Sequence, residues 1–264
     1  MSESIPTETG IGPAMSIFAH LDELRRRVVA IAIAVAACTI VGWVQRTRIL
    51  GWLLIPYERA WIDRGLPGLP ELQTLSPTDV FVSYLQLAFS AGLALATPII
   101  FYQLWAFISP GLYAREKRLI VPFVVSSSGL FIAGVMFAFY VMLPMTYGYF
   151  FSLLGPVTEG GTLLTQRPTF EFYLDFSTRL ILSTGIVFEL PLFLSFLVLA
   201  GLVTPRQLLE FSRWAILLSF IVGAIATPGP EVSSQILVSL CLVILYFLSI
   251  ATAFLLKPRQ AKTS

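Results

Sequence analysis

Runs of about 20 apolar residues recur along this 264-residue chain, and they constrain its fold more than any other feature. A helix of that length spans the roughly 30 Å of hydrocarbon in a bilayer. Only helices and closed barrels satisfy their backbone hydrogen bonds there, and the short alternating segments of a barrel are missing. Charged residues make up 12% of the chain, about half of the share that is usual in soluble domains. The sequence therefore predicts an all-α, polytopic membrane protein.

We expect six transmembrane helices, which bring both ends of the chain to one side of the membrane. Residues 16–256 would form a single membrane domain, between a disordered tail at 1–15 and a second tail at 257–264. Of the 17 Lys and Arg residues, 11 fall on the side of the termini. By the positive-inside rule that side is cytoplasmic, which is an N-in, C-in topology. The six spans are predicted at about 28–44, 79–105, 119–142, 179–202, 214–226 and 236–256.

The segments outside these spans carry patterns of their own. Residues 17–28 repeat apolar side chains at helical spacing, which predicts an amphipathic interface helix leading into the first span. Long loops are predicted at 45–78, with an aromatic amphipathic stretch broken at Pro56, and at 147–178. The fifth span, with only 13 residues at 214–226, would be about 20 Å long, which is short for a bilayer.

Carboxylates among cations occur at the predicted cytoplasmic rim. Glu116 lies in the loop within 106–123 that joins the second and third spans, next to three cationic residues. Glu23 precedes the first span, four residues before Arg27 and in the favourable order for a helical ion pair. Such carboxylates suit guanidinium ligands, which bind them through paired, charge-assisted hydrogen bonds. The alternative is a solvated charged surface, whose ion pairs contribute about 0–1 kcal/mol each.

Glu189 is the one ionisable residue well inside a predicted span. A charge at the bilayer centre costs about 2.5–3.5 kcal/mol on insertion scales, so such a residue is a functional candidate. Three interpretations are open: a proton relay, a hydrogen-bonding contact for another transmembrane helix, and a structural carboxyl beside a kink at Pro191. We favour the helix contact, because a proton relay usually needs several such groups.

Several other chemistries lack the residues that they need. Cys38 and Cys241 lie within apolar runs and His20 is the only histidine, so no disulfide, metal site or nucleophilic triad is expected. The chain has no Gly-rich Lys loop for a nucleotide and no basic platform for nucleic acid. We therefore expect no enzyme activity, no cofactor and no nucleic-acid partner. The alternative function is a secondary transporter of a small solute, which would favour internal repeats and several intramembrane polar groups.

Four motifs, in order and within residues 16–256, resemble those of the TatC family. They read HLDELRRR before the first span, YQLWAFISPGLYAREKR at the first cytoplasmic loop, FELP in the fourth span and TP…SQ between the fifth and sixth. TatC is the multispanning core of the twin-arginine protein translocase. The resemblance implies a concave, glove-like bundle in the cell inner membrane. It also implies export of folded proteins that is driven by the proton-motive force.

The resemblance further implies roles for single residues. The positions implied to bind twin-arginine signal peptides are Glu23, Arg25, Phe107 and Glu116. Those implied to contact partner helices in the membrane are Gln103 and Glu189, and Pro56 matches a proline of the first outer loop. The implied partners are single-span subunits of the TatA and TatB types, signal peptides, the lipid bilayer and further copies in an oligomer. One departure, TPGPE where the family often reads TPPD, leaves the role of Glu231 open.

Overall fold

The computed structural model describes residues 17–108, 120–156, 163–164, 167–226 and 232–256. Six stretches of these residues are long and apolar enough to cross a membrane. The predicted all-α membrane protein with six transmembrane helices is therefore confirmed. In chain order the elements are α1 (Ile17–Val44), α2 (Arg46–Asp63), α3 (Pro77–Ile108), α4 (Ile120–Phe137), the π-helical η3 (Ala138–Met142), α5 (Leu143–Ser152), β1 (Gly155–Pro156), β2 (Leu163–Leu164), α6 (Phe170–Val187), α7 (Leu190–Leu199), α8 (Pro205–Ala226) and α9 (Val232–Leu256).

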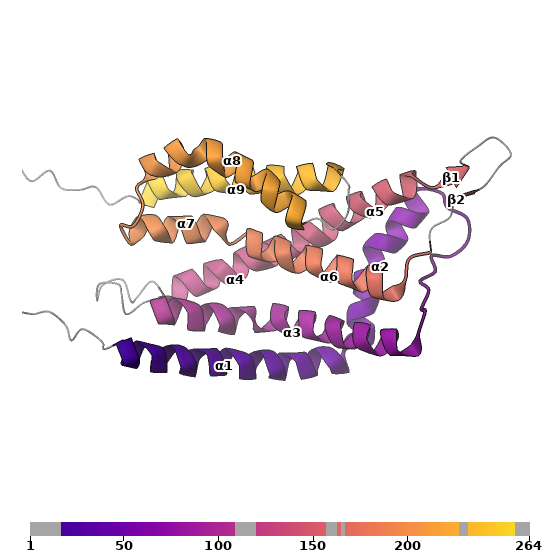
Figure 1. Cartoon of the computed structure of the whole chain (residues 1–264), viewed down its shortest axis with the longest axis horizontal. Helices are drawn as coiled ribbons and strands as arrows, with labels where there is room; N and C mark the ends of the chain where they lie inside the picture. The colour runs from indigo at the N-terminus through magenta and orange to yellow at the C-terminus, as the bar shows by residue number, and fades with distance from the viewer. Residues whose placement is uncertain (1–16, 109–119, 157–162, 165–166, 227–231, 257–264) are drawn as a thin grey trace, which may run out of the picture.

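The spanning helices lie side by side along the long dimension of the molecule (Figure 1). α1 packs on α3 at one edge, α3 packs on α4 and α6, and α9 packs on α7 and α8 at the other edge. α2 runs at a steep angle to them and packs against α5. The N-terminal end of α1 and the C-terminal end of α9 lie at the same end of the bundle, as an even number of crossings requires (Figure 1).

Glycines allow the close approach of α1 to α3. A Cβ atom added at Gly42 would lie 2.6 Å from the carbonyl oxygen of Ala88, and one added at Gly92 would collide with the backbone of Thr39. The two helices therefore touch backbone to backbone, as small residues permit in membrane helix pairs. Gly134 lets α4 approach α6 in the same way.

The third and fourth spans are both interrupted. In the third span, α4 continues through the π-helical η3 into α5. In the fourth, α6 ends at Val187 and α7 begins at Leu190. Pro191 has no amide hydrogen, so the carbonyl group of Val187 cannot receive a helical hydrogen bond from it. This break places Glu189 at the N-cap of α7, inside the fourth span.

The first predicted loop, 45–78, contains a helix. α2 has 18 residues and continues through Pro56, so the expected break at that residue is wrong. Pro56 and Tyr57 are buried, and the ring of Tyr57 meets those of Tyr147 and Tyr173 at centroid distances of 5.2 and 5.3 Å. This packing offsets the roughly 3 kcal/mol that a proline costs inside a helix.

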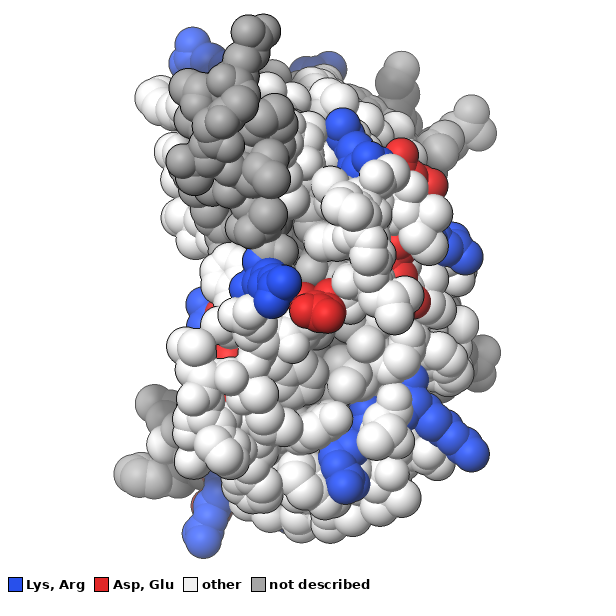
Figure 2. Space-filling model, turned by 90° about the vertical axis from the view of Figure 1, so that its right-hand side faces the viewer, with Lys and Arg blue, Asp and Glu red and all other residues white. Residues whose placement is uncertain are grey.

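The second predicted loop, 147–178, is shorter than expected because helices extend into it from both sides. α5 runs to Ser152, and α6 begins at Phe170 with Thr169 as its N-cap. Between them β1 and β2 form an antiparallel ladder of two residues each. Gln73 pairs with Thr169, so the two outer connections touch. Figure 2 looks onto this end of the bundle, where charged side chains of both signs are scattered among uncharged ones.

α8 is longer than the fifth predicted span. It begins at Pro205 and has 22 residues, so the expected short helix of 13 residues is wrong. The amide group of Thr204 donates to Gln207 Oε1 over 2.8 Å, and that of Gln207 donates to Thr204 Oγ1 over 3.3 Å. This capping box starts the helix at its polar end. Arg206 and Arg213 lie in this helix and are exposed.

Candidate functional site

Five side chains gather where the N-terminal part of α1 packs against the C-terminal part of α3. We call them the Glu23 cluster, and they are His20, Glu23, Arg27, Gln103 and Phe107. The three residues on α1 are spaced by three and four positions, and the two on α3 by four. Side chains at such spacing lie on one face of a helix, so each set can face the other.

Arg27 joins the two helices within this cluster. Its Nη2 and Nε atoms donate to Glu23 Oε1 over 2.5 and 3.0 Å. Its Nη1 atom donates to Gln103 Oε1 over 3.2 Å. The side chains of Arg27 and Glu23 are only 22% and 18% exposed, so water reaches this ion pair poorly. The pairing that sequence spacing predicted is confirmed.

The second carboxylate oxygen of Glu23 is not used by the ion pair with Arg27. Glu23 Oε2 is buried and accepts no hydrogen bond from the described part of the chain. Leaving a buried charged acceptor unpaired costs more than a typical hydrogen bond contributes. The cluster is therefore able to accept a further cationic donor at this oxygen.

An aromatic stack borders the ion pair. The rings of His20 and Phe107 lie 4.5 Å apart between centroids and 19° from parallel. α3 ends one residue later, at Ile108. The stack thus lies at the end of the bundle where α3 stops.

The other residues proposed from the sequence lie elsewhere. Arg25 is exposed and lines a separate surface hollow with Asp22, Arg26 and Val29. Pro56 is buried within α2, and this helix lies toward the opposite end of the bundle from the start of α1 (Figure 1). Gln103, expected to contact a partner helix, is bonded to Arg27 within the chain. Glu116 and Glu231 lie outside the described residues.

Glu189 lies apart from the Glu23 cluster, at the break in the fourth span. Its carboxyl group interacts with the hydroxyl group of Ser127 and with the backbone of Phe131, both on α4. Its Oε1 atom is buried and has no hydrogen-bond partner within the described ranges. Ser127 Oγ also accepts the indole N–H of Trp105, on α3, over 3.0 Å. A row of polar contacts thus joins three spans and ends at an oxygen atom that has no partner in the described part of the chain.

Two members of the Glu23 cluster were not singled out by sequence reasoning. Arg27 was recognised as an ion-pair partner of Glu23, but its bond to α3 has no local sequence signal. The stacking of His20 on Phe107 likewise requires the tertiary fold. Among the described residues, no three His, Cys, Asp or Glu side chains form a possible metal site.

Comparisons with known proteins agree on one family. Residues 19–240 match the family model of the Sec-independent protein translocase protein TatC. The chain is 35% identical to TatC of Koribacter versatilis over 248 residues, which are 94% of this chain and 88% of the relative. It is 42% identical to TatC of Helicobacter pylori over 184 residues, 70% of this chain and 71% of the relative. A crystal structure of the twin-arginine translocase receptor TatC superposes with a TM-score of 0.75 at 33% identity, over 89% of this chain and 98% of that one.

Proposed function

The chain belongs to the TatC family of Sec-independent protein translocase proteins, and from this we propose that it is the signal-peptide receptor of a twin-arginine translocase. It is a multi-pass membrane protein of a protein-transport family and not an enzyme. The alternative of a small-solute transporter has no support from these relatives.

The observation that carries the proposal is the buried Oε2 atom of Glu23. Arg27 occupies Oε1, and Oε2 accepts no bond from the described residues. An arginine of an incoming signal peptide can donate to Oε2 while its other nitrogens reach neighbouring acceptors. The planar guanidinium fork suits this geometry, and the ammonium group of lysine does not reproduce it. We therefore expect arginine to be preferred over lysine.

Three further residues belong to this proposed site. Glu116 follows α3 in the sequence, and we propose it as the second carboxylate for the arginine pair. Phe107 lies at the end of α3, where its stacked ring offers apolar surface to the peptide. Arg25 is exposed and faces away from the cluster, so we propose that it contacts the peptide at the rim of the site.

Glu189 is proposed as a contact for single-span partners of the TatA and TatB types. Its unpaired Oε1 atom offers an acceptor inside the membrane, where a polar side chain of a partner helix gains from such a bond. Gln103 is held by Arg27, so its proposed role moves from partner contact to support of the peptide site. Pro56 is proposed to act through the packing of α2.

The remaining features follow from the family and the charge distribution. We propose an inner-membrane location with both termini in the cytoplasm, since most Lys and Arg residues lie on that side. We also propose a concave, glove-like bundle that works as an oligomer with its partners. Export of folded proteins would then draw on the proton-motive force.

The test is binding of a labelled signal peptide to the purified chain in detergent, with Arg-Arg compared with Lys-Lys. The Glu23→Gln variant should weaken Arg-Arg binding about tenfold or more, as the loss of a buried charge-assisted bond predicts. Glu210→Gln is the matched control, because Glu210 is exposed on α8. Equal binding of both peptides, or no effect of Glu23→Gln, would refute this receptor site.

A further inference from the structure

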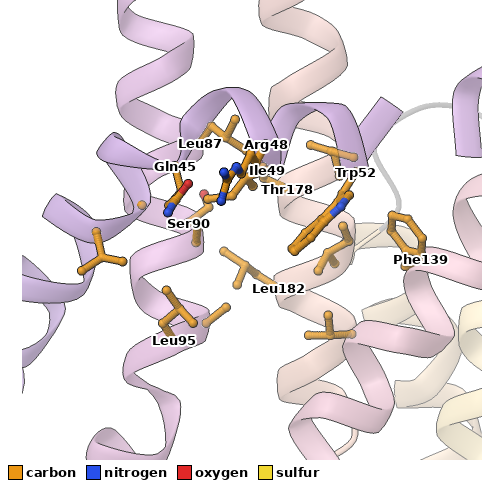
Figure 3. A pocket seen from close by; sticks show the side chains of 17 residues that line it. Gln45, Arg48, Ile49, Trp52, Leu87, Ser90, Leu95, Phe139, Thr178 and Leu182 are labelled. Carbon is orange, nitrogen blue, oxygen red and sulfur yellow. The ribbon is translucent and has the colours of Figure 1, made fainter. Parts of the chain in front are cut away.

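A cavity of about 580 Å³ lies among α1, α2, α3, α4, η3 and α6 (Figure 3). No residue of the Glu23 cluster lines it, and neither does Glu189. Its volume falls in the range of about 300–1,000 Å³ that is common for small-molecule sites. Most of its lining side chains are apolar, and the polar exceptions besides the Trp52 indole are Gln45, Arg48, Ser90 and Thr178.

The polar side chains are concentrated toward one end of the cavity. Figure 3 shows Gln45, Arg48 and Ser90 close together there, with Leu182 and Leu95 further along. Thr178 is already satisfied, since its Oγ1 atom donates to the carbonyl group of Leu174 over 2.6 Å. The cavity therefore has a cationic end and an apolar end.

Arg48 differs from its neighbour Arg46 in having no partner among the described residues. Arg46 donates to the carbonyl group of Trp43 over 3.0 Å, and its guanidinium lies 4.8 Å from the centre of the Trp43 ring. Arg48 makes no ion pair or hydrogen bond with the residues that the structure describes. Its charge is thus available to an anion at the cavity.

The position of this cationic end matches the surface of a membrane. α1 ends at Val44, so Gln45 and Arg48 follow directly after the first span. Trp52, one turn further along α2, is a residue type enriched at headgroup level. From Ala88, which faces Gly42, the cavity follows α3 to Leu95, which is roughly 10 Å of helix. A cation at headgroup depth suits the phosphate of a lipid, and apolar surface below it suits an acyl chain.

We propose that this cavity binds one phospholipid, with the phosphate at Arg48 and Gln45 and one acyl chain between α3 and α6. A cationic signal peptide would be repelled by Arg48. The proposal does not depend on the peptide site, because it uses none of the same residues.

The experiment uses the full chain in liposomes with a phosphatidylglycerol that carries a diazirine near the end of one acyl chain. After irradiation, mass spectrometry locates the label. We expect it to concentrate on 87–95 and 178–182, relative to the exposed apolar face at 216–222 of α8. A diacylglycerol with the same diazirine lacks the phosphate and should label these segments less.

Two variants and a control test the cause. Arg48→Gln should lower labelling of 87–95 about threefold or more, as expected for a lost charge-assisted hydrogen bond. Ala94→Trp should lower it by filling the cavity. Arg59→Gln changes an exposed arginine about three turns further along the same helix, outside the cavity lining, and should leave the labelling unchanged. Arg48 is itself exposed, so Arg48→Gln should fold normally and carries the test if Ala94→Trp does not.

Three results would overturn the proposal. One is equal labelling of the cavity and of α8, which would mean that lipid contacts are unselective. Another is an unchanged pattern in Arg48→Gln. The third is loss of the label when single-span partners are added, with their helices cross-linked at Ala94 instead, which would assign the cavity to a protein.

Discussion

Replacing Gly42 by alanine should destabilise the protein through the contact between α1 and α3. The added methyl group would lie 2.6 Å from the carbonyl oxygen of Ala88, and real Cβ atoms essentially never approach closer than 3.0 Å, so the backbones must separate by about 0.4 Å or more. Overpacking of this kind costs about 1–3 kcal/mol. The change of glycine to alanine in a helix returns about 0.5–1 kcal/mol. We expect a net loss of about 1–2 kcal/mol.

The assay is thermal unfolding of the purified chain in one detergent, followed by tryptophan fluorescence. At about 2–4 °C per kcal/mol for a chain of this size, Gly42→Ala should lower the apparent Tm by several degrees. Gly129→Ala is the matched control, because a Cβ atom there meets nothing within 4 Å. It should leave the Tm unchanged or raise it. If Gly42→Ala were as stable as Gly129→Ala, the close backbone contact between α1 and α3 would be wrong.

The remaining predictions concern single side chains. Tyr173→Phe should lower the free energy of unfolding by about 1–2 kcal/mol, because the Tyr173 hydroxyl group donates to the carbonyl group of Leu53 in α2. Tyr57→Phe should be neutral or stabilising, because the Tyr57 hydroxyl group is buried without a partner among the described residues. Denaturation of both variants tests these two expectations. Burial also raises the pKa of Tyr57 from 10.0 to about 12. The unfolded chain therefore loses this proton more readily, so stability should fall between about pH 10 and 12 in the wild type and fall less in Tyr57→Phe. Glu189→Ala should leave peptide binding intact and reduce co-purification of single-span partners, and normal co-purification would remove the proposed contact. Thr204→Ala should cost about 1 kcal/mol by removing the N-cap of α8, to be measured by the same thermal assay, and an unchanged Tm would show that this cap contributes nothing.

The number of spans could be predicted because apolar length alone decides whether a helix can cross a bilayer. The ends of the helices could not be found in the same way. Thr204 and Gln207 stand three residues apart, which is a readable capping signal, but the fifth span was predicted to begin only at residue 214. Pro56 was expected to end a helix, and the burial of its neighbours in the fold outweighs that local preference.

The candidate site likewise has a part that could be predicted from the sequence and a part that could not. The ion pair of Glu23 and Arg27 could be predicted because both residues lie on one helix, four positions apart. The bond from Arg27 to Gln103 and the stacking of His20 on Phe107 join helices that are distant in sequence. No local pattern indicates such contacts, so only the packing of α1 on α3 reveals the cluster as a whole.

α3 carries parts of the proposed peptide site and of the proposed partner contact. Gln103 and Phe107 leave it toward α1, while Trp105 is rotated by about 200° from each and donates to Ser127, beside Glu189. Any two ligands of one protein obey thermodynamic linkage, and α3 connects these two sites directly. If a bound signal peptide tightens the binding of a partner helix by some factor, the partner must tighten the binding of the peptide by the same factor. Peptide affinity measured on the chain alone would then differ from the affinity in the assembled translocase by that factor.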